Sequence, residues 1–179
     1  KEFLAIAKAR PGEIFYSTAG RGTVGHLSSE LLNSLAKIKL TAGGGVSSPF
    51  SPVDATTFTE AELRAAVEAA GNWGTYVTAH AFTSEAVQRA IAAGVKCIEH
   101  GFLMDEATAK LIAEKGIWLS LQPLPEELRQ GFPVGSVERA KADEVWPGIG
   151  RAYELAKKYR IKTAWGTDVL FSHALAQRQ

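Results

Sequence analysis

The stretch from Tyr76 to Gly101 constrains the fold of this chain more than any other. It reads YVTAHAFTSEAVQRAIAAGVKCIEHG, with one apolar run ending at His80, an alanine-rich helical pattern, and a second apolar run ending at His100. This pattern predicts a strand, a helix and a second strand. Because parallel strands joined by a helix lie side by side, both imidazoles should emerge at the same edge of the sheet.

Two interpretations of these histidines are open. A single histidine at the end of a strand is commonly a satisfied structural residue, and one imidazole specifies no metal site. A pair at matched strand ends instead favours one shared divalent ion. The pattern therefore predicts a metal site built on His80 and His100.

The rest of the chain continues the alternation of strand and helix. After residue 36, strands are predicted at Ile38–Leu40, Ile117–Leu121 and Lys162–Trp165. A helix should begin after Thr59, which starts a capping pattern, and another should cover Val137–Lys158, with Pro147 as the point where it could break. This order predicts an α/β fold with a parallel sheet.

Composition excludes several classes of protein. The 179 residues are 46% apolar and 22% charged with a net charge of +1, so one or two globular domains are expected, and neither nucleic acid nor a membrane is indicated as a partner. We see no apolar run of membrane-spanning length and no signal peptide. Cys97 is the single cysteine, which excludes an internal disulfide and suits the cytoplasm, with the periplasm as the alternative.

Several other residues are expected to be structural. Cys97 should be a small buried core residue, and His26 and His173 should lie in a loop or helix. The aromatic residues expected to pack in the core are Phe82, Trp118, Trp165 and Phe171.

The first 35 residues resemble a segment of another kind of protein. The run AKARPGEIFYSTAGRGTVGHLSSELL is similar to the helix, turn, strand and glycine-rich loop of periplasmic tricarboxylate-type solute receptors. The resemblance implies a contact with an anion near Ser17 to Thr23. We therefore predict an N-terminal helix-strand-helix segment over residues 1–35 and a separate unit over residues 36–179.

The second unit resembles the metal-dependent amidohydrolase superfamily, in its imidazolonepropionase-like and prolidase-like branch. The motifs are IKLTAGGGVSSP, TAHAFT, CIEHG and AWGTD, which place Lys39, His80, His100 and Asp168 at the ends of successive predicted strands. The resemblance implies a partial (β/α)8 TIM barrel, comprising about strands 4 to 8. In such barrels the active site lies at the carboxyl edge of the strands.

The resemblance also implies a role for each residue. Lys39 would be a carboxylated lysine bridging two metal ions, His80 and His100 would ligate the second ion, and Asp168 would contact the first and move the proton of the activated water. One or two divalent ions are expected, with Zn²⁺ as the expected metal. From the residues alone, Lys39 could equally be a paired or snorkelling lysine, and Asp168 a turn residue or helix cap.

The chain departs from the family pattern in one respect. The family also uses a His-x-His pair from the first barrel strand, and this sequence contains none. We therefore expect a fragment or chimera of about five of the eight barrel units. An open sheet has unpaired edges, so a homo-oligomer that covers them is expected.

The expected function is that of a metal-dependent hydrolase. It would use metal-activated water to cleave the amide or ester bond of a small molecule, such as a dipeptide, an N-acyl amino acid or a small ester. Without the His-x-His pair, the enzyme could be an impaired or promiscuous esterase. The alternative is a non-catalytic chimeric scaffold or small-carboxylate-binding module that oligomerises through its exposed sheet edges.

Overall fold

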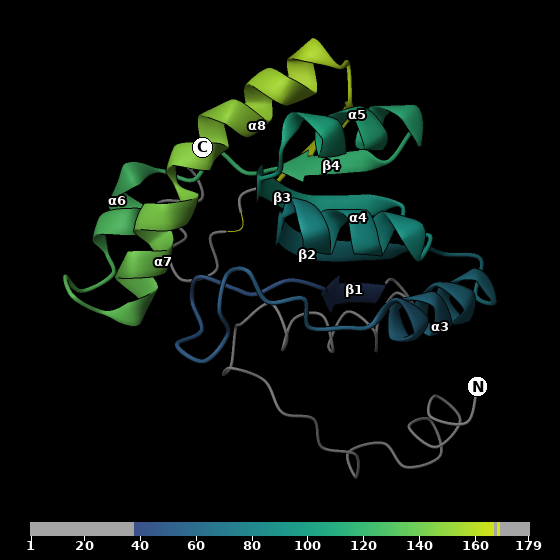
Figure 1. Ribbon diagram of the computed structural model, residues 1–179, viewed down its shortest axis with the longest axis horizontal. Helices are drawn as coiled ribbons and strands as arrows, with labels where there is room; N and C mark the ends of the chain where they lie inside the picture. The colour runs from purple at the N-terminus through teal and green to yellow at the C-terminus, as the bar shows by residue number, and fades with distance from the viewer. Residues whose placement is uncertain (1–37, 167, 169–179) are drawn as a thin grey trace, which may run out of the picture.

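A five-stranded parallel sheet forms the centre of the molecule. The computed structural model describes residues 38–166 and residue 168. The strands follow one another in the order β1-β2-β3-β4-β5, which is their order in the sequence. Their bounds are Ile38–Thr41 (β1), Val77–Thr83 (β2), Cys97–Leu103 (β3), Trp118–Leu121 (β4) and Lys162–Trp165 (β5). In Figure 1, β1 to β4 are stacked from bottom to top with their carboxyl ends to the left. The predicted α/β fold is confirmed.

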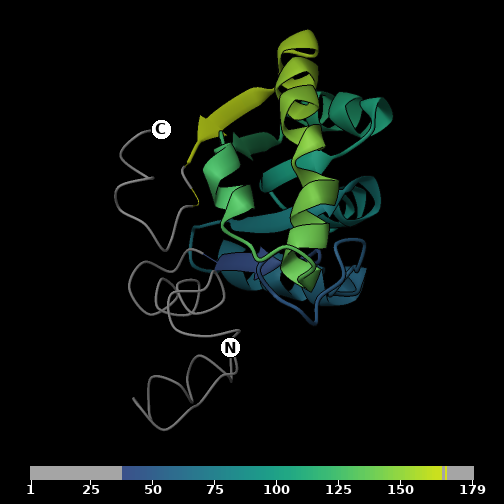
Figure 2. The same ribbon diagram turned by 90° about the vertical axis from the view of Figure 1, so that its left-hand side faces the viewer.

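Six helices connect the strands in the described part of the chain. Three of them, α3, α4 and α5, lie across one face of the sheet, whereas α6, α7 and the beginning of α8 lie beyond the carboxyl ends of the strands (Figures 1 and 2). Their bounds are Glu60–Gly71 (α3), Ser84–Ala92 (α4), Glu106–Glu114 (α5), Glu126–Gln130 (α6), Val137–Val145 (α7) and Pro147–Lys158 (α8). None of these helices is long and apolar enough to cross a membrane.

Four of the described helices, α3, α4, α5 and α7, begin after a residue whose side chain caps them. Thr59 and Glu62 form the predicted capping box of α3, in which each side chain accepts a hydrogen bond from the other residue's backbone N–H. The predicted long helix over residues 137–158 is divided, because α7 ends at Val145 and α8 starts at Pro147. A Cβ on Gly148 would lie 2.2 Å from the Phe102 carbonyl oxygen, so only glycine lets α8 approach β3 this closely.

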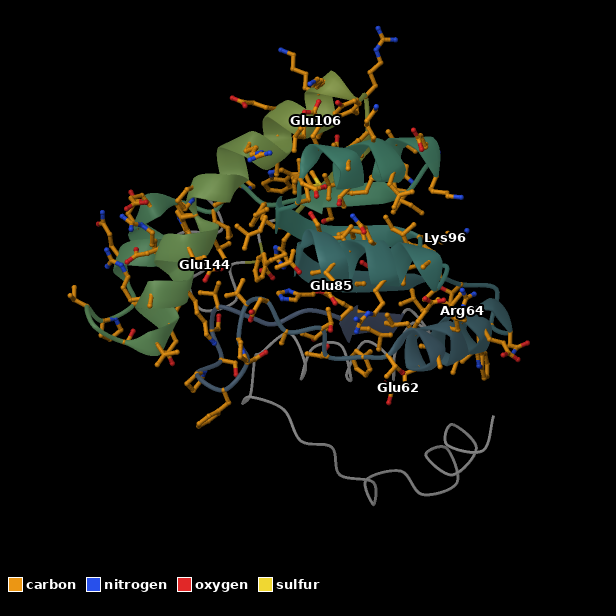
Figure 3. The ribbon with its side chains drawn as sticks, viewed as in Figure 1. Glu62, Arg64, Glu85, Lys96, Glu106 and Glu144 are labelled. Atoms are coloured by element: carbon orange, nitrogen blue, oxygen red, sulfur yellow. The ribbon has the colours of Figure 1, made fainter. Side chains whose placement is uncertain are left out.

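Charged side chains lie on the outside of this layer of helices. Figure 3 shows Glu62 on α3, Glu85 on α4 and Glu106 on α5. The Glu106 carboxylate accepts hydrogen bonds from the Lys158 ammonium and the Tyr159 hydroxyl, which ties the start of α5 to the end of α8.

The core lies between the sheet and its helices. Ala79, Ile98 and Leu119 are neighbours in register on β2, β3 and β4, and all three are fully buried. Val87 of α4 and Ile112 of α5 are buried over the same core. Successive residues of a strand point to opposite faces, so this row defines the helix-covered face.

Three predictions about the core are wrong. Cys97 is half-buried rather than buried, because it stands on the other face of the sheet beside Thr78 and Trp118. Trp118 is 47% exposed for the same reason, since helices α3 to α5 cover the opposite face. Trp165 is 60% exposed because it lies on the edge strand β5, where all four residues are exposed.

The buried position of Phe82 is confirmed, with 4% of its surface exposed. The predictions for His26, Phe171 and His173 fall outside the described residues, as does the whole N-terminal segment 1–35.

Candidate metal centre

His80 and His100 lie next to each other near the carboxyl ends of β2 and β3. Their ring centroids are 4.6 Å apart and the ring planes cross at 78°. His80 is 8% exposed and His100 is 1% exposed. The prediction that the two imidazoles share one edge of the sheet is confirmed. Parallel pairing brings the ends of β2 and β3 together, although His80 pairs in register with Glu99 and His100 with Ala81.

The backbone at His100 departs from regular strand geometry. Its φ angle is 77°, in the left-handed region that glycine favours, and Gly101 follows with a φ of 63°. The register between β2 and β3 shifts just after His100 pairs with Ala81. A non-glycine residue in this region costs roughly 1–3 kcal/mol and persists where the surroundings impose it, which happens most often at functional sites.

The His80 ring is oriented by a backbone carbonyl. Its Nε2 lies 2.9 Å from the carbonyl oxygen of Gly44, in the loop that follows β1. A carbonyl oxygen can only accept, so Nε2 must carry the proton, and Nδ1 of the neutral ring holds a free lone pair. This is the arrangement in which a partner of the far nitrogen fixes the tautomer of a metal-ligating histidine.

Both imidazoles are held neutral. Burial lowers the pKa of His80 to about 4, although the bond to Gly44 opposes the shift. Burial also lowers the pKa of His100 well below its usual value, and the nearby His80 and Lys39 lower it further. Since only the neutral ring can bind a metal ion, both side chains are ready to do so at pH 7 without losing a proton.

Asp168 reaches the same place from the loop after β5. Its Oδ2 lies 3.7 Å from Nε2 of His100, and its side chain is 25% exposed. This separation is longer than a hydrogen bond and comparable to the distance between two ligands of one ion. Burial raises the pKa of Asp168, while the charge of Lys39 opposes that shift.

Lys39 lies deeper on the same sheet. It pairs in register with Thr78 on β2, whereas Thr41, two residues later, pairs with His80. Residues two apart on a strand share a face, so Lys39 and His80 point to the same side. The charge of Lys39 lowers the pKa of both histidines and of Asp168, which shows that all four predicted residues share one electrostatic environment.

The donor set fits a divalent ion in its chemistry but is incomplete. In the described residues, His80 Nδ1 and both ring nitrogens of His100 are buried without a hydrogen-bond partner. Each such atom costs about 1–3 kcal/mol, and a bound cation would remove this penalty for His80 Nδ1 and for one of the two nitrogens of His100. Yet across residues 38–166 and 168, no three His, Cys, Asp or Glu side chains converge on one point as metal ligands would. The structure therefore supplies an imidazole pair with a carboxylate beside it, and Lys39 is the remaining candidate ligand.

A polar network beside the histidines was missed by the sequence analysis. The Glu99 carboxylate accepts hydrogen bonds from the Thr78 hydroxyl at 3.0 Å and from the Gln122 amide at 3.1 Å. Gln122 is only 2% exposed, and its Oε1 has no partner in the described residues. The available signal was its position directly after β4, at the same sheet edge as the other candidates.

Residues 12–150 match the sequence model of the amidohydrolase family. This chain is a member of the amidohydrolase family. Over 134 residues it is 32% identical to ochratoxinase of Aspergillus niger, an alignment that covers 73% of this chain but only 28% of ochratoxinase. The amidohydrolase chain thus spans little more than a quarter of the length of that relative.

Solved structures of related amidohydrolases have the same fold. A prolidase in complex with N-methylphosphonate-L-proline superimposes with a TM-score of 0.73 at 31% identity, covering 90% of this chain and 44% of the prolidase. The A. niger ochratoxinase structure gives a TM-score of 0.69 at 26% identity and covers 87% and 39% of the two chains. The predicted family and the partial barrel are confirmed.

The family match bears on the N-terminal segment as well. It begins at residue 12, inside the region predicted to resemble solute receptors, and the comparisons give that resemblance no support. The domain boundary between residues 35 and 36 stays a prediction.

Proposed function

We propose that this chain carries part of the active site of a metal-dependent hydrolase that cleaves an amide or ester bond in a small molecule. The observation that carries the proposal is the pair of buried neutral imidazoles, His80 and His100, with unpartnered nitrogens beside Asp168. Two imidazoles and a carboxylate at the carboxyl edge of parallel strands match the place and the chemistry of a barrel hydrolase site.

The relatives favour a small substrate with an amide bond. One similar structure is a prolidase that holds a proline derivative, and prolidases and ochratoxinase are members of a family that generally depends on divalent metals. Dipeptides, N-acyl amino acids and small esters are accordingly the substrate classes proposed for this chain.

The candidate residues would have two roles, metal binding and proton transfer. His80 through Nδ1 and His100 through Nε2 would hold the ion, with Zn²⁺ as the proposed metal, and a carboxylated Lys39 would be a further ligand. When bound, such an ion polarises a carbonyl and lowers the pKa of water. Asp168 would take up a proton and pass it to the leaving group, a role suited to a carboxylate whose pKa is raised by burial.

A second candidate function rests on the sheet edges. All four residues of the edge strand β5 are exposed, and Trp165 is 60% exposed. An uncovered edge strand is a template for pairing with another chain. These features favour a homo-oligomeric scaffold or binding module, in which the histidines would be structural.

Hydrolysis assays on the zinc-loaded chain distinguish the two candidates. The panel consists of Xaa-Pro dipeptides, N-acetyl amino acids and p-nitrophenyl esters, each measured with and without a chelator. We expect turnover that the chelator removes and added zinc restores, that is lost in His100→Ala, and that Asp168→Asn abolishes while zinc stays bound. The absence of both zinc binding and turnover on any substrate, together with an oligomer by light scattering, would favour the module.

A further inference from the structure

Lys141 is a buried lysine that lies outside the candidate metal centre. It is located on α7 and only 9% exposed. Its ammonium donates to three backbone carbonyl oxygens of the loop after β1, those of Gly45 at 3.4 Å, Ser48 at 2.6 Å and Ser51 at 2.5 Å. A buried charge is costly unless it is fully hydrogen-bonded, and here three donors meet three acceptors from one loop.

This loop is held in one shape. The Gly44 N–H donates to the Ala55 carbonyl at 3.0 Å, and the Ala55 N–H donates to the Pro52 carbonyl at 3.1 Å. A Cβ on Gly44 would lie 1.5 Å from the Pro52 carbonyl oxygen. Any residue other than glycine at this position would therefore clash with the loop. The Lys141 ammonium reaches the same loop from a helix 90 residues away in sequence. Figure 1 shows α7 beside the loop, beyond the carboxyl ends of the strands.

The loop in turn holds His80 at two points. The Gly43 N–H donates to the His80 carbonyl at 2.9 Å, which fixes the backbone. The Gly44 carbonyl accepts from His80 Nε2, also at 2.9 Å, which fixes the ring. The position of the Gly44 carbonyl therefore decides which ring nitrogen carries the proton and which is free to bind a metal.

We propose that Lys141 is a positioning residue for the metal centre. Its ammonium clamps the loop so that the Gly44 carbonyl keeps the proton of His80 on Nε2 and leaves Nδ1 free. Lysine suits this task because its ammonium is a compact point charge with three rotatable donors. The identity of the ligand of Nδ1 rests on the proposed function, whereas the effect on the tautomer of His80 does not.

The test compares Lys141→Met with a matched control, Lys158→Met. The first variant keeps the unbranched apolar part of the side chain and removes the ammonium group that holds the loop. The second removes an exposed lysine that pairs with Glu106, far from the site. For each folded protein, the ¹⁵N chemical shifts of the His80 ring report the tautomer in the metal-free state at pH 7, and calorimetric titration gives the Kd for zinc.

We expect Lys141→Met to shift the His80 ring toward a mixture of tautomers and to raise the Kd for zinc about tenfold or more, the effect typical of lost outer partners of metal ligands. Lys158→Met should match the wild type in both measurements. A Lys141→Met protein with an unchanged tautomer and a Kd within about twofold of the wild type would overturn the proposal.

Two further outcomes keep the proposal testable. If Lys141→Met does not fold, Lys141→Gln removes the charge and keeps one amide donor, and the same two criteria decide. If the wild type binds no zinc, the proposed function fails, but the tautomer comparison in the metal-free proteins still confirms or contradicts the role of Lys141.

Discussion

Ile98 and Cys97 are neighbours on β3, yet their side chains leave the sheet on opposite faces and meet different surroundings. Ile98 is fully buried between Ala79 and Leu119 on the helix-covered face. Cys97 is half-buried and stands in register between Thr78 and Trp118 on the other face. Alternate residues of the same strand thus belong to an apolar core and to a polar, partly open surface.

The two faces of the sheet therefore have different roles, one in stability and the other in the candidate site. The helix-covered face removes apolar surface from water and carries the free energy of folding. The other face and the carboxyl edge bear His80 and the Glu99 network, with buried polar atoms that lack partners in the described residues. Single substitutions on the two faces should therefore have different consequences.

The largest expected effect is on the helix-covered face. Ile98→Ala should lower the free energy of unfolding by about 4 kcal/mol, because it removes a fully buried side chain and leaves a cavity under α4 and α5. Cys97→Ala, one residue away, should cost less than about 1 kcal/mol. Urea unfolding of both variants measures the difference. Equal losses would contradict the assignment of the two faces.

Acid should next destabilise the site edge. Burial lowers the pKa of His80 from 6.5 to about 4. Between these two pH values, His80 is protonated in the unfolded chain but stays neutral in the folded chain. The contribution of the neutral His80 to the free energy of unfolding is therefore fully present above pH 6.5. This free energy should fall by roughly 3 kcal/mol as the pH drops toward 4, and His100 should add to the loss.

Urea midpoints at pH 7.5, 6 and 5 test this expectation, since the paired surface carboxylates titrate at lower pH. His80→Gln should flatten the profile relative to the wild type. A wild-type midpoint that stays constant over this range would show that the histidines are not buried in the neutral form.

The smallest effect is expected at Trp118, on the face opposite the helices. Trp118→Ala should lower the free energy of unfolding by about 1 kcal/mol or less, since 47% of the side chain is exposed. A Phe102→Ala variant, which truncates a fully buried aromatic residue, is the matched comparison and should cost about 3–5 kcal/mol. A large loss at Trp118 would mean that another part of the chain covers this face.

The proximity of the histidines could be predicted because it depends on local pattern and on one general rule. Two apolar runs joined by a helical pattern specify parallel strands, and parallel strands bring their ends together. Asp168 and Lys39 were placed by motifs of a known family, and the structure sets both in the electrostatic environment of His80 and His100.

Other features depend on contacts that a local pattern does not contain. Lys141 meets the loop after β1 across 90 residues of sequence, and Gln122 follows a short strand without a motif. Cys97 and Trp118 were misplaced because their apolar neighbours indicate a buried strand but do not tell which face the helices cover. Each of these residues needed the tertiary arrangement to be interpreted.

The central claim is that His80 and His100 are metal ligands, and measuring zinc binding tests it most directly. The measurement is calorimetric titration of zinc into the metal-free wild type, His80→Ala and His100→Ala at pH 7, with each protein first shown to unfold cooperatively. We predict that the wild type binds at least one zinc ion per chain and that either substitution weakens binding about 100-fold or more. A wild type that binds no zinc, or variants that bind it as tightly as the wild type, would contradict the assignment of His80 and His100 as metal ligands.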